Sequence, residues 1–96
     1  TAAVIGVDDL YVDRLRQATA PVANVEGSIE FHSALAVAAG GYHRIDRRYV
    51  LRRIREIESS QGRIGRRMRE LDVLIRRRVR RVLADAQDAE GAGPGR

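Results

Sequence analysis

The stretch IESSQGRIGRRMRELDVLI, residues 57–75, constrains the fold more than any other, because it is compatible with two different structures. Apolar positions run through it at alternating spacings of three and four residues, the repeat that lines one side of a coiled-coil helix. The positions of this seam are Ile54, Ile57, Gln61, Ile64, Met68, Leu71 and Ile75. Gly62 and Gly65 oppose a single helix, since each costs about 1 kcal/mol relative to Ala in a helix interior. The stretch is therefore either one continuous helix or a helix that stops at Gly62 and precedes a strand.

The rest of the chain favours the second of these structures. Residues 1–7 are a short apolar run typical of a buried strand, and residues 28–41 show period-two alternation through Ile29 and Phe31. Residues 45–62 form an amphipathic helical pattern that Asp46 can cap. The expected elements, in order, are strand 1–7, helix 8–18, strand 21–28, strand 28–41, helix 45–62, strand 70–75 and helix 76–87.

This order predicts an α+β fold of the split βαβ, or ferredoxin-like, type. In it a four-stranded antiparallel sheet carries two helices, and a C-terminal helix follows. The alternative is a mostly α fold with one long coiled-coil helix over residues 46–89. We expect a single small domain over residues 1–90 and a flexible Gly/Pro tail over residues 91–96.

Composition excludes several classes of protein. The chain has no Cys, which rules out a disulfide framework and a Cys nucleophile and fits a reducing compartment. No apolar run approaches the roughly 20 residues that a membrane span needs. We therefore predict a cytoplasmic protein that does not enter the membrane.

Positive charge is concentrated in the middle of the chain, and all of it is Arg. Residues 43–83 carry fifteen Arg and five acids, net +10, while residues 1–42 have a net charge of −3 and residues 84–96 of −2. The three segments sum to the overall +5. Such a segment is either a face exposed to solvent or a surface that binds along a polyanion such as nucleic acid. The predicted polyanion patch consists of Arg66, Arg67, Arg76, Arg77, Arg78, Arg80 and Arg81.

Three stretches, TAPVANVEGSIEF (19–31), VLRRIREIESSQGRI (50–64) and RELDVLI (69–75), resemble the middle of hydroxymethyldihydropterin pyrophosphokinase. That folate-pathway enzyme transfers a diphosphate from ATP to a pterin alcohol, and its fold is also ferredoxin-like. Its Gly-Arg pair after a helix is matched by Gly62 and Arg63, and its Arg-x-Leu-Asp motif by residues 69–72. The resemblance extends over residues 5–75 with gaps.

The resemblance implies a nucleotide or phosphate site and a metal site. Its phosphate-binding residues are Arg63, Arg69 and Glu58, and its metal ligand is Asp72, which would hold Mg²⁺ together with ATP. Arg forks bind phosphate oxygens bidentately, and Mg²⁺ neutralises transferring phosphoryl groups. The positions that match the pterin pocket are Thr19, Val22, Phe31 and Ser33.

This chain also departs from the family. The second metal-binding Asp corresponds to Leu74, the pterin-binding Asn corresponds to Ser33, and the catalytic His has no counterpart. We therefore expect a degenerate core that keeps weak nucleotide or phosphate binding and is not a competent enzyme alone, and we assign no catalytic residue. The alternative, from another class, is an Arg-rich helical dimer that binds nucleic acid or an acidic protein. Under either function the chain is expected to form a homodimer. A core of this size leaves an apolar stripe on residues 64–83 exposed, and a second copy would cover it.

Overall fold

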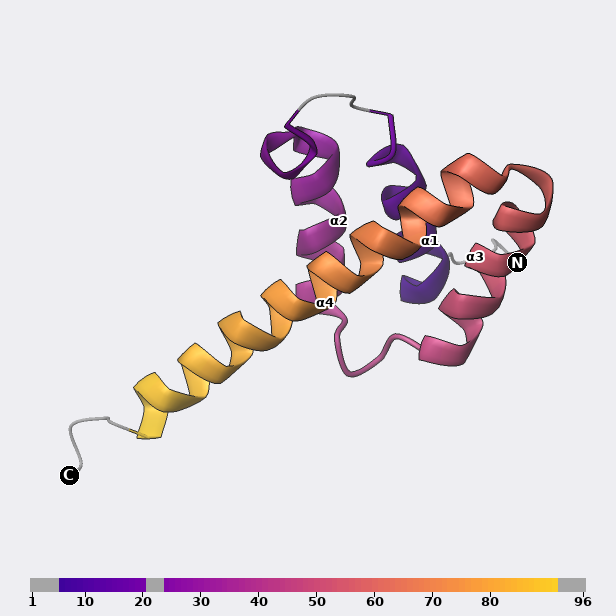
Figure 1. Ribbon diagram of the computed structural model, residues 1–96. Coiled ribbons are helices and arrows are strands. Elements are labelled where there is room, and N and C mark those ends of the chain that lie inside the picture. Colours follow the sequence, from indigo (N-terminus) through magenta and orange to yellow (C-terminus); the bar gives the residue numbers. More distant parts are fainter. Residues whose placement is uncertain (1–5, 21–23, 92–96) are drawn as a thin grey trace, which may run out of the picture.

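The computed structural model describes residues 6–20 and 24–91, with side-chain surroundings through residue 86, and the regular elements in these residues are all helices (Figure 1). The elements are α1 (Val7–Gln17), the 3₁₀ turn η1 (Val25–Gly27), α2 (Ile29–Gly40), α3 (Arg47–Ser60) and α4 (Gly62–Gly91). Helix α3 packs on α4 and α1 packs on α2, while α4 also contacts α1 and α2. The C-terminal half of α4 extends beyond the body formed by the other helices.

The predicted sheet is wrong, because no strand occurs in the described residues and most of the predicted strand residues among them are helical. Residues 29–40 form α2, which begins where the Ser28 hydroxyl accepts a hydrogen bond from the Phe31 amide at 3.1 Å. Its buried residues Phe31, Ala34 and Ala38 recur at spacings of three and four, so the helical period prevails over the period of two. Residues 70–75 lie inside α4, and residues 25–27 form η1. Residues 1–5 of the expected first strand lie outside the described residues.

The all-helical alternative describes the fold better, but its single helix over residues 46–89 is also wrong. Helix α3 ends at Gln61, whose φ of −137° and ψ of 72° leave the helical region, and α4 starts at Gly62. The chain then folds back. A Cβ at Gly65 would lie 2.4 Å from the Cα of Glu58, so this close approach of the two helices requires glycine. The seam of Ile54 to Ile75 is thereby folded onto itself instead of facing a second chain.

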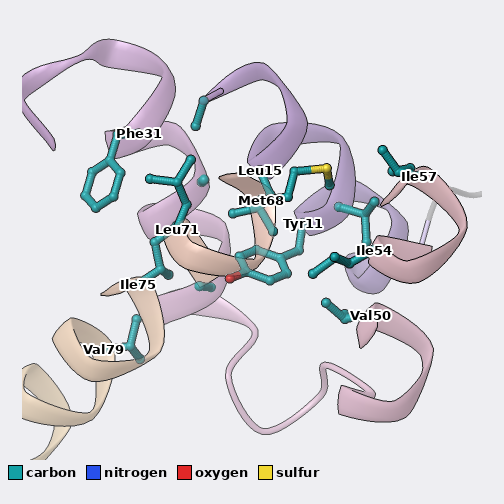
Figure 2. Close-up of a cluster of buried hydrophobic side chains, with 14 residues drawn as sticks. Tyr11, Leu15, Phe31, Val50, Ile54, Ile57, Met68, Leu71, Ile75 and Val79 are labelled. Carbon is teal, nitrogen blue, oxygen red and sulfur yellow. The ribbon is translucent and has the colours of Figure 1, made fainter. Parts of the chain in front are cut away.

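The apolar seam and its partners form the core (Figure 2). Each of α1, α2, α3 and α4 contributes residues that are almost inaccessible to water; among them are Tyr11, Leu15, Phe31, Val50, Ile54, Met68, Ile75 and Val79. Burial of a large aliphatic or aromatic side chain stabilises a fold by about 1.5–3 kcal/mol. Gln61 is the polar member of the seam, and it stays exposed at the turn, where it accepts a hydrogen bond from Arg16 at 2.9 Å.

Polar contacts fix the N-terminal ends of α1 and α3 against each other. The Asp8 carboxylate accepts a hydrogen bond from the Asp46 amide at 2.8 Å, and the Tyr49 hydroxyl donates to Asp9. Asp46 itself caps α3, as predicted, since its side chain accepts from the amides of the next helical turn. These contacts orient the side of α3 that carries Arg47 toward α4.

Candidate functional site

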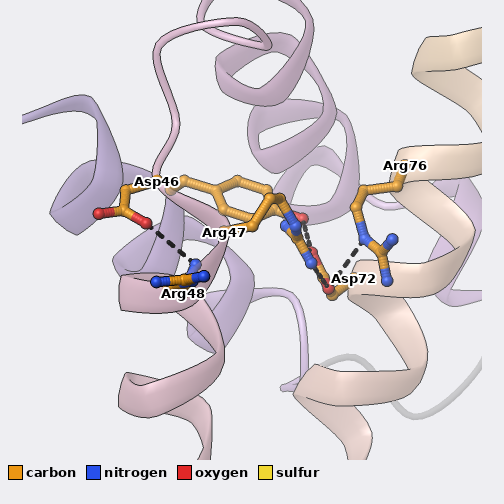
Figure 3. Close-up of polar contacts among 6 residues, drawn as sticks. Asp46, Arg47, Arg48, Asp72 and Arg76 are labelled. Atoms are coloured by element: carbon orange, nitrogen blue, oxygen red, sulfur yellow. Dashed lines mark hydrogen bonds and ion pairs between the residues drawn. The ribbon is translucent and has the colours of Figure 1, made fainter.

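A buried carboxylate, Asp72, lies at the centre of the strongest polar cluster in the described residues (Figure 3). Helix α4 supplies Asp72 and Arg76, α3 supplies Arg47, and α1 supplies Tyr11. The Tyr11 hydroxyl donates to Oδ1 at 2.6 Å, and Arg47 donates to both carboxylate oxygens, at 3.2 and 2.7 Å. Arg76 donates from Nε to Oδ2 at 3.2 Å. The cluster therefore joins three helices at one side chain.

Electrostatics keeps this carboxylate ionised. Burial alone would raise the pKa of Asp72, but the hydrogen bonds from Arg47 and Tyr11 and the positive charges of Arg47 and Arg76 outweigh burial and hold that pKa below its usual value. For Tyr11, burial and the neighbouring negative charge raise the pKa of the hydroxyl far above its ordinary value, so it remains a donor. One carboxylate and two guanidinium groups leave the cluster with one net positive charge.

The surroundings of Asp72 do not fit a Mg²⁺ ion. Both of its oxygens accept hydrogen bonds from cationic or hydroxyl donors, and a divalent cation would lie beside two guanidinium groups. No group of three or more His, Cys, Asp or Glu that could hold a metal occurs in the part of the chain that is described. Leu74, two residues further on, cannot act as a ligand and is partly exposed. Binding of Mg²⁺ together with ATP, the cofactor expected from the sequence, stays a prediction.

The three residues matched to phosphate binding are only partly brought together. Arg69 forms an ion pair with Glu58 at 3.1 Å across the α3–α4 pair, and the two side chains remain 48 % and 32 % exposed to water. Arg63 is exposed and makes no hydrogen bond or ion pair within the described residues. A guanidinium group that is paired with a carboxylate has fewer N–H donors left for a phosphate. Arg63 is therefore more available to a phosphate than Arg69.

Where the structure describes them, the residues matched to the pterin pocket lie in different surroundings. Phe31 is fully buried in the core, and Ser33 is a half-buried residue of α2. Thr19 is half-buried after α1, where its hydroxyl donates to the Arg16 carbonyl at 2.7 Å. Val22 lies outside the described residues.

A small pocket of about 130 Å³ opens beside the Asp72 cluster. Its wall includes Tyr11, Arg47 and Arg76 together with Tyr42, Ala38 and Ile45. Sites for nucleotide-sized ligands usually measure about 300–1,000 Å³, so this pocket is too small for ATP. The contacts of the cluster itself join α1, α3 and α4.

The predicted polyanion patch divides into two groups. Arg66, Arg77, Arg80 and Arg81 are exposed and have no hydrogen-bond or ion-pair partner among the described residues. The others are engaged: Arg76 with Asp72, Arg78 with the Phe31 ring at 5.8 Å from its centroid, and Arg67, which is half-buried, with a neighbour. The first group, with Arg63, is the outer Arg face of α4, composed of Arg63, Arg66, Arg77, Arg80 and Arg81.

The outer Arg face is a true helix face. At 100° per residue these five positions fall within about 100° of arc, opposite the buried line of Met68, Ile75 and Val79. Glu70 shares this arc, so the face has a net charge of four positive units. Arg63 and Arg66 lie toward one end and the other three toward the other, about 16 Å apart along the helix.

No protein-family profile, no curated protein and no solved structure matches this chain. None of the helices in the described part is both long enough and apolar enough to cross a lipid bilayer.

Proposed function

We propose that this domain binds the phosphate backbone of nucleic acid through the outer Arg face of α4. The observation that supports the proposal is a row of five exposed guanidinium groups on one side of one helix, none engaged by an acid among the described residues. Unpaired Arg at this density repel one another, and a polyanion relieves that repulsion while its counterions are released.

The dimensions suit a nucleic-acid backbone. Arg63 and Arg81 are eighteen residues apart, which is about 27 Å along a helix. A duplex advances about 3.4 Å per nucleotide of one strand, so the face is as long as about eight nucleotides. A rigid helix presents its cations at fixed intervals and loses little conformational entropy when it binds.

Base recognition is not part of this proposal. Tyr11 and Phe31 are buried, and Tyr49 uses its hydroxyl to bind Asp9. Single-stranded bases are usually recognised by stacking on accessible aromatic rings, which the Arg face lacks. We therefore expect little preference for base sequence.

Fluorescence anisotropy with short DNA and RNA duplexes tests the proposal. The affinity of the wild-type protein should fall steeply as the salt concentration rises. In a plot of the logarithm of the association constant against the logarithm of the salt concentration, each phosphate neutralised contributes about −0.9 to the slope. A triple variant, Arg77→Gln, Arg80→Gln and Arg81→Gln, should lower that slope by about 2–3 and weaken binding to all sequences alike.

A matched control removes the same charge from α3. Arg48, Arg52 and Arg55 are also exposed on a helix, and their replacement by Gln changes the net charge equally. The proposal requires that this control lose much less affinity than the α4 variant. Equal losses would mean that only net charge matters, and no binding at low salt would refute the proposal. Equally tight binding of polyglutamate would indicate an acidic protein as the partner.

A further inference from the structure

A groove of about 620 Å³ runs between α2 and the extending half of α4 and borders the outer Arg face at Arg81, which belongs to both. Its floor is apolar: Leu35, Ala36 and Ala39 come from α2, and Val79 and Val82 from α4. His32, Arg78 and Arg81 form its polar rim. Small residues on α2 allow another helix to approach closely.

The apolar side of α4 continues past the point where the body of the protein covers it. Ile75 and Val79 are buried, but Val82, the next position of the same stripe, is 60 % exposed. Ala86 follows four residues later and is also exposed. The stripe is therefore uncovered at Val82 and Ala86, next to the groove.

The chain itself contains a segment that fits this groove. Residues 84–90 carry three acids and no basic residue, with Ala at 84, 86 and 89, and the helix continues through them. Asp85 is exposed and lies seven residues, about two turns, after Arg78, so both flank the same apolar stripe. A small, acidic helix end is complementary to an apolar groove with a basic rim.

We propose that two copies of this chain form a two-fold symmetric dimer in which their α4 helices pack antiparallel, each C-terminal end in the groove of the other copy. The two-fold axis passes close to Val82. Antiparallel packing then brings Arg78 of each copy next to Asp85 of the other, and covers Val82 and Ala86 from both chains at once.

The symmetry explains why a second copy fits better than an unrelated helix. In a two-fold interface both copies use the same patch. If that patch has a basic half and an acidic half, the basic half of each copy faces the acidic half of the other. The residues brought together around the axis, 78–86, span about 12 Å of helix. An interface of this size belongs to the small end of the specific range, so we expect dimers at micromolar concentration.

Charge reversal tests the contact. Sedimentation should show a dimer for the wild-type protein, and Arg78→Glu and Asp85→Arg should each shift it toward the monomer, at least tenfold in dissociation constant. The variant with both changes restores opposite charges across the interface and should dimerise again. Far-UV circular dichroism establishes that each variant is folded.

Disulfide trapping tests the geometry, because the chain has no Cys of its own. Val82→Cys, close to the axis, should give a covalent dimer under mild oxidation, while Arg77→Cys, on the outer Arg face, should not. A wild-type monomer throughout the micromolar range refutes the proposal. Failure of the double charge reversal to restore the dimer, or equal trapping at both positions, also refutes it.

Discussion

Replacement of Asp72 by Asn should destabilise the fold by about 3 kcal/mol. The change removes the charge of a carboxylate that is only 1 % exposed and that accepts hydrogen bonds from Tyr11, Arg47 and Arg76. Loss of one partner from a buried ion pair typically costs 3–5 kcal/mol. The side chains of Arg47 and Arg76 are 36 % and 30 % exposed and can turn toward water, so the low end of that range applies.

Urea denaturation measures this loss. A domain of this size has about 5–15 kcal/mol of total stability, and with a urea dependence near 1.5 kcal/mol per molar the midpoint should fall by about 2 M. Asp13→Asn is the matched control, because Asp13 is exposed and accepts a hydrogen bond only from Gln17. That control should change stability by less than about 0.5 kcal/mol.

The pH dependence gives the argument a second readout. The folded-state pKa of Asp72 is lowered, so its ionised form stabilises the fold above about pH 4, the ordinary value, and this stabilisation is lost as pH falls through the folded-state pKa. The difference between the wild-type protein and the Asp72→Asn variant should therefore be constant near neutrality and shrink in acid. A difference no larger than that of the Asp13→Asn control would show that the cluster does not join the helices.

The remaining predictions concern Tyr11 and the α3–α4 turn. The raised pKa of Tyr11 means that the folded chain keeps this hydroxyl protonated, whereas the unfolded chain releases the proton near pH 10. Stability should therefore decline above about pH 10, and in urea titrations a Tyr11→Phe variant should lose less stability between pH 9 and pH 11 than the wild-type protein. Gly65→Ala should destabilise the fold by at least 1–3 kcal/mol, since its Cβ would collide with the backbone of Glu58. Gly62→Ala, three residues earlier in open space, should be neutral or stabilising in the same thermal melts, and the same loss at both sites would contradict the close-approach argument.

Local helix signals in the sequence were sufficient for two of the elements. The amphipathic pattern over residues 45–62 and its Asp46 cap predict α3, and the pattern over residues 8–18 predicts α1. Residues 76–87 are helical, but they belong to α4, which begins at Gly62. Each of these predictions rests on neighbouring residues. The strands failed because an Ala-rich segment such as residues 34–39 fits both a period of two and a period of 3.6, and burial of Phe31 and Ala38 on one helix face decided between them.

The site required information that no local pattern contains. Asp72 stands out in the sequence as an acid among Arg, but its partners Tyr11 and Arg47 are 61 and 25 residues away. Only the turn at Gln61 brings α3 back onto α4 and sets Arg47 beside Asp72. By contrast, the cations of the outer Arg face could be found from spacing along one helix, although the sequence did not show which of them are engaged elsewhere.

The separation of Tyr11 from Asp72 also affects how the chain folds while it is being made. Helix α1 is synthesised first, but the acceptor for its buried hydroxyl is added 61 residues later. At about 5–20 residues per second, this delay lasts about 3–12 s. During that interval α1 can pack on α2, which follows it directly, but Tyr11 lacks its partner on α4. The contact that joins α1 to α3 and α4 at Asp72 can therefore form only after α4 has left the ribosome.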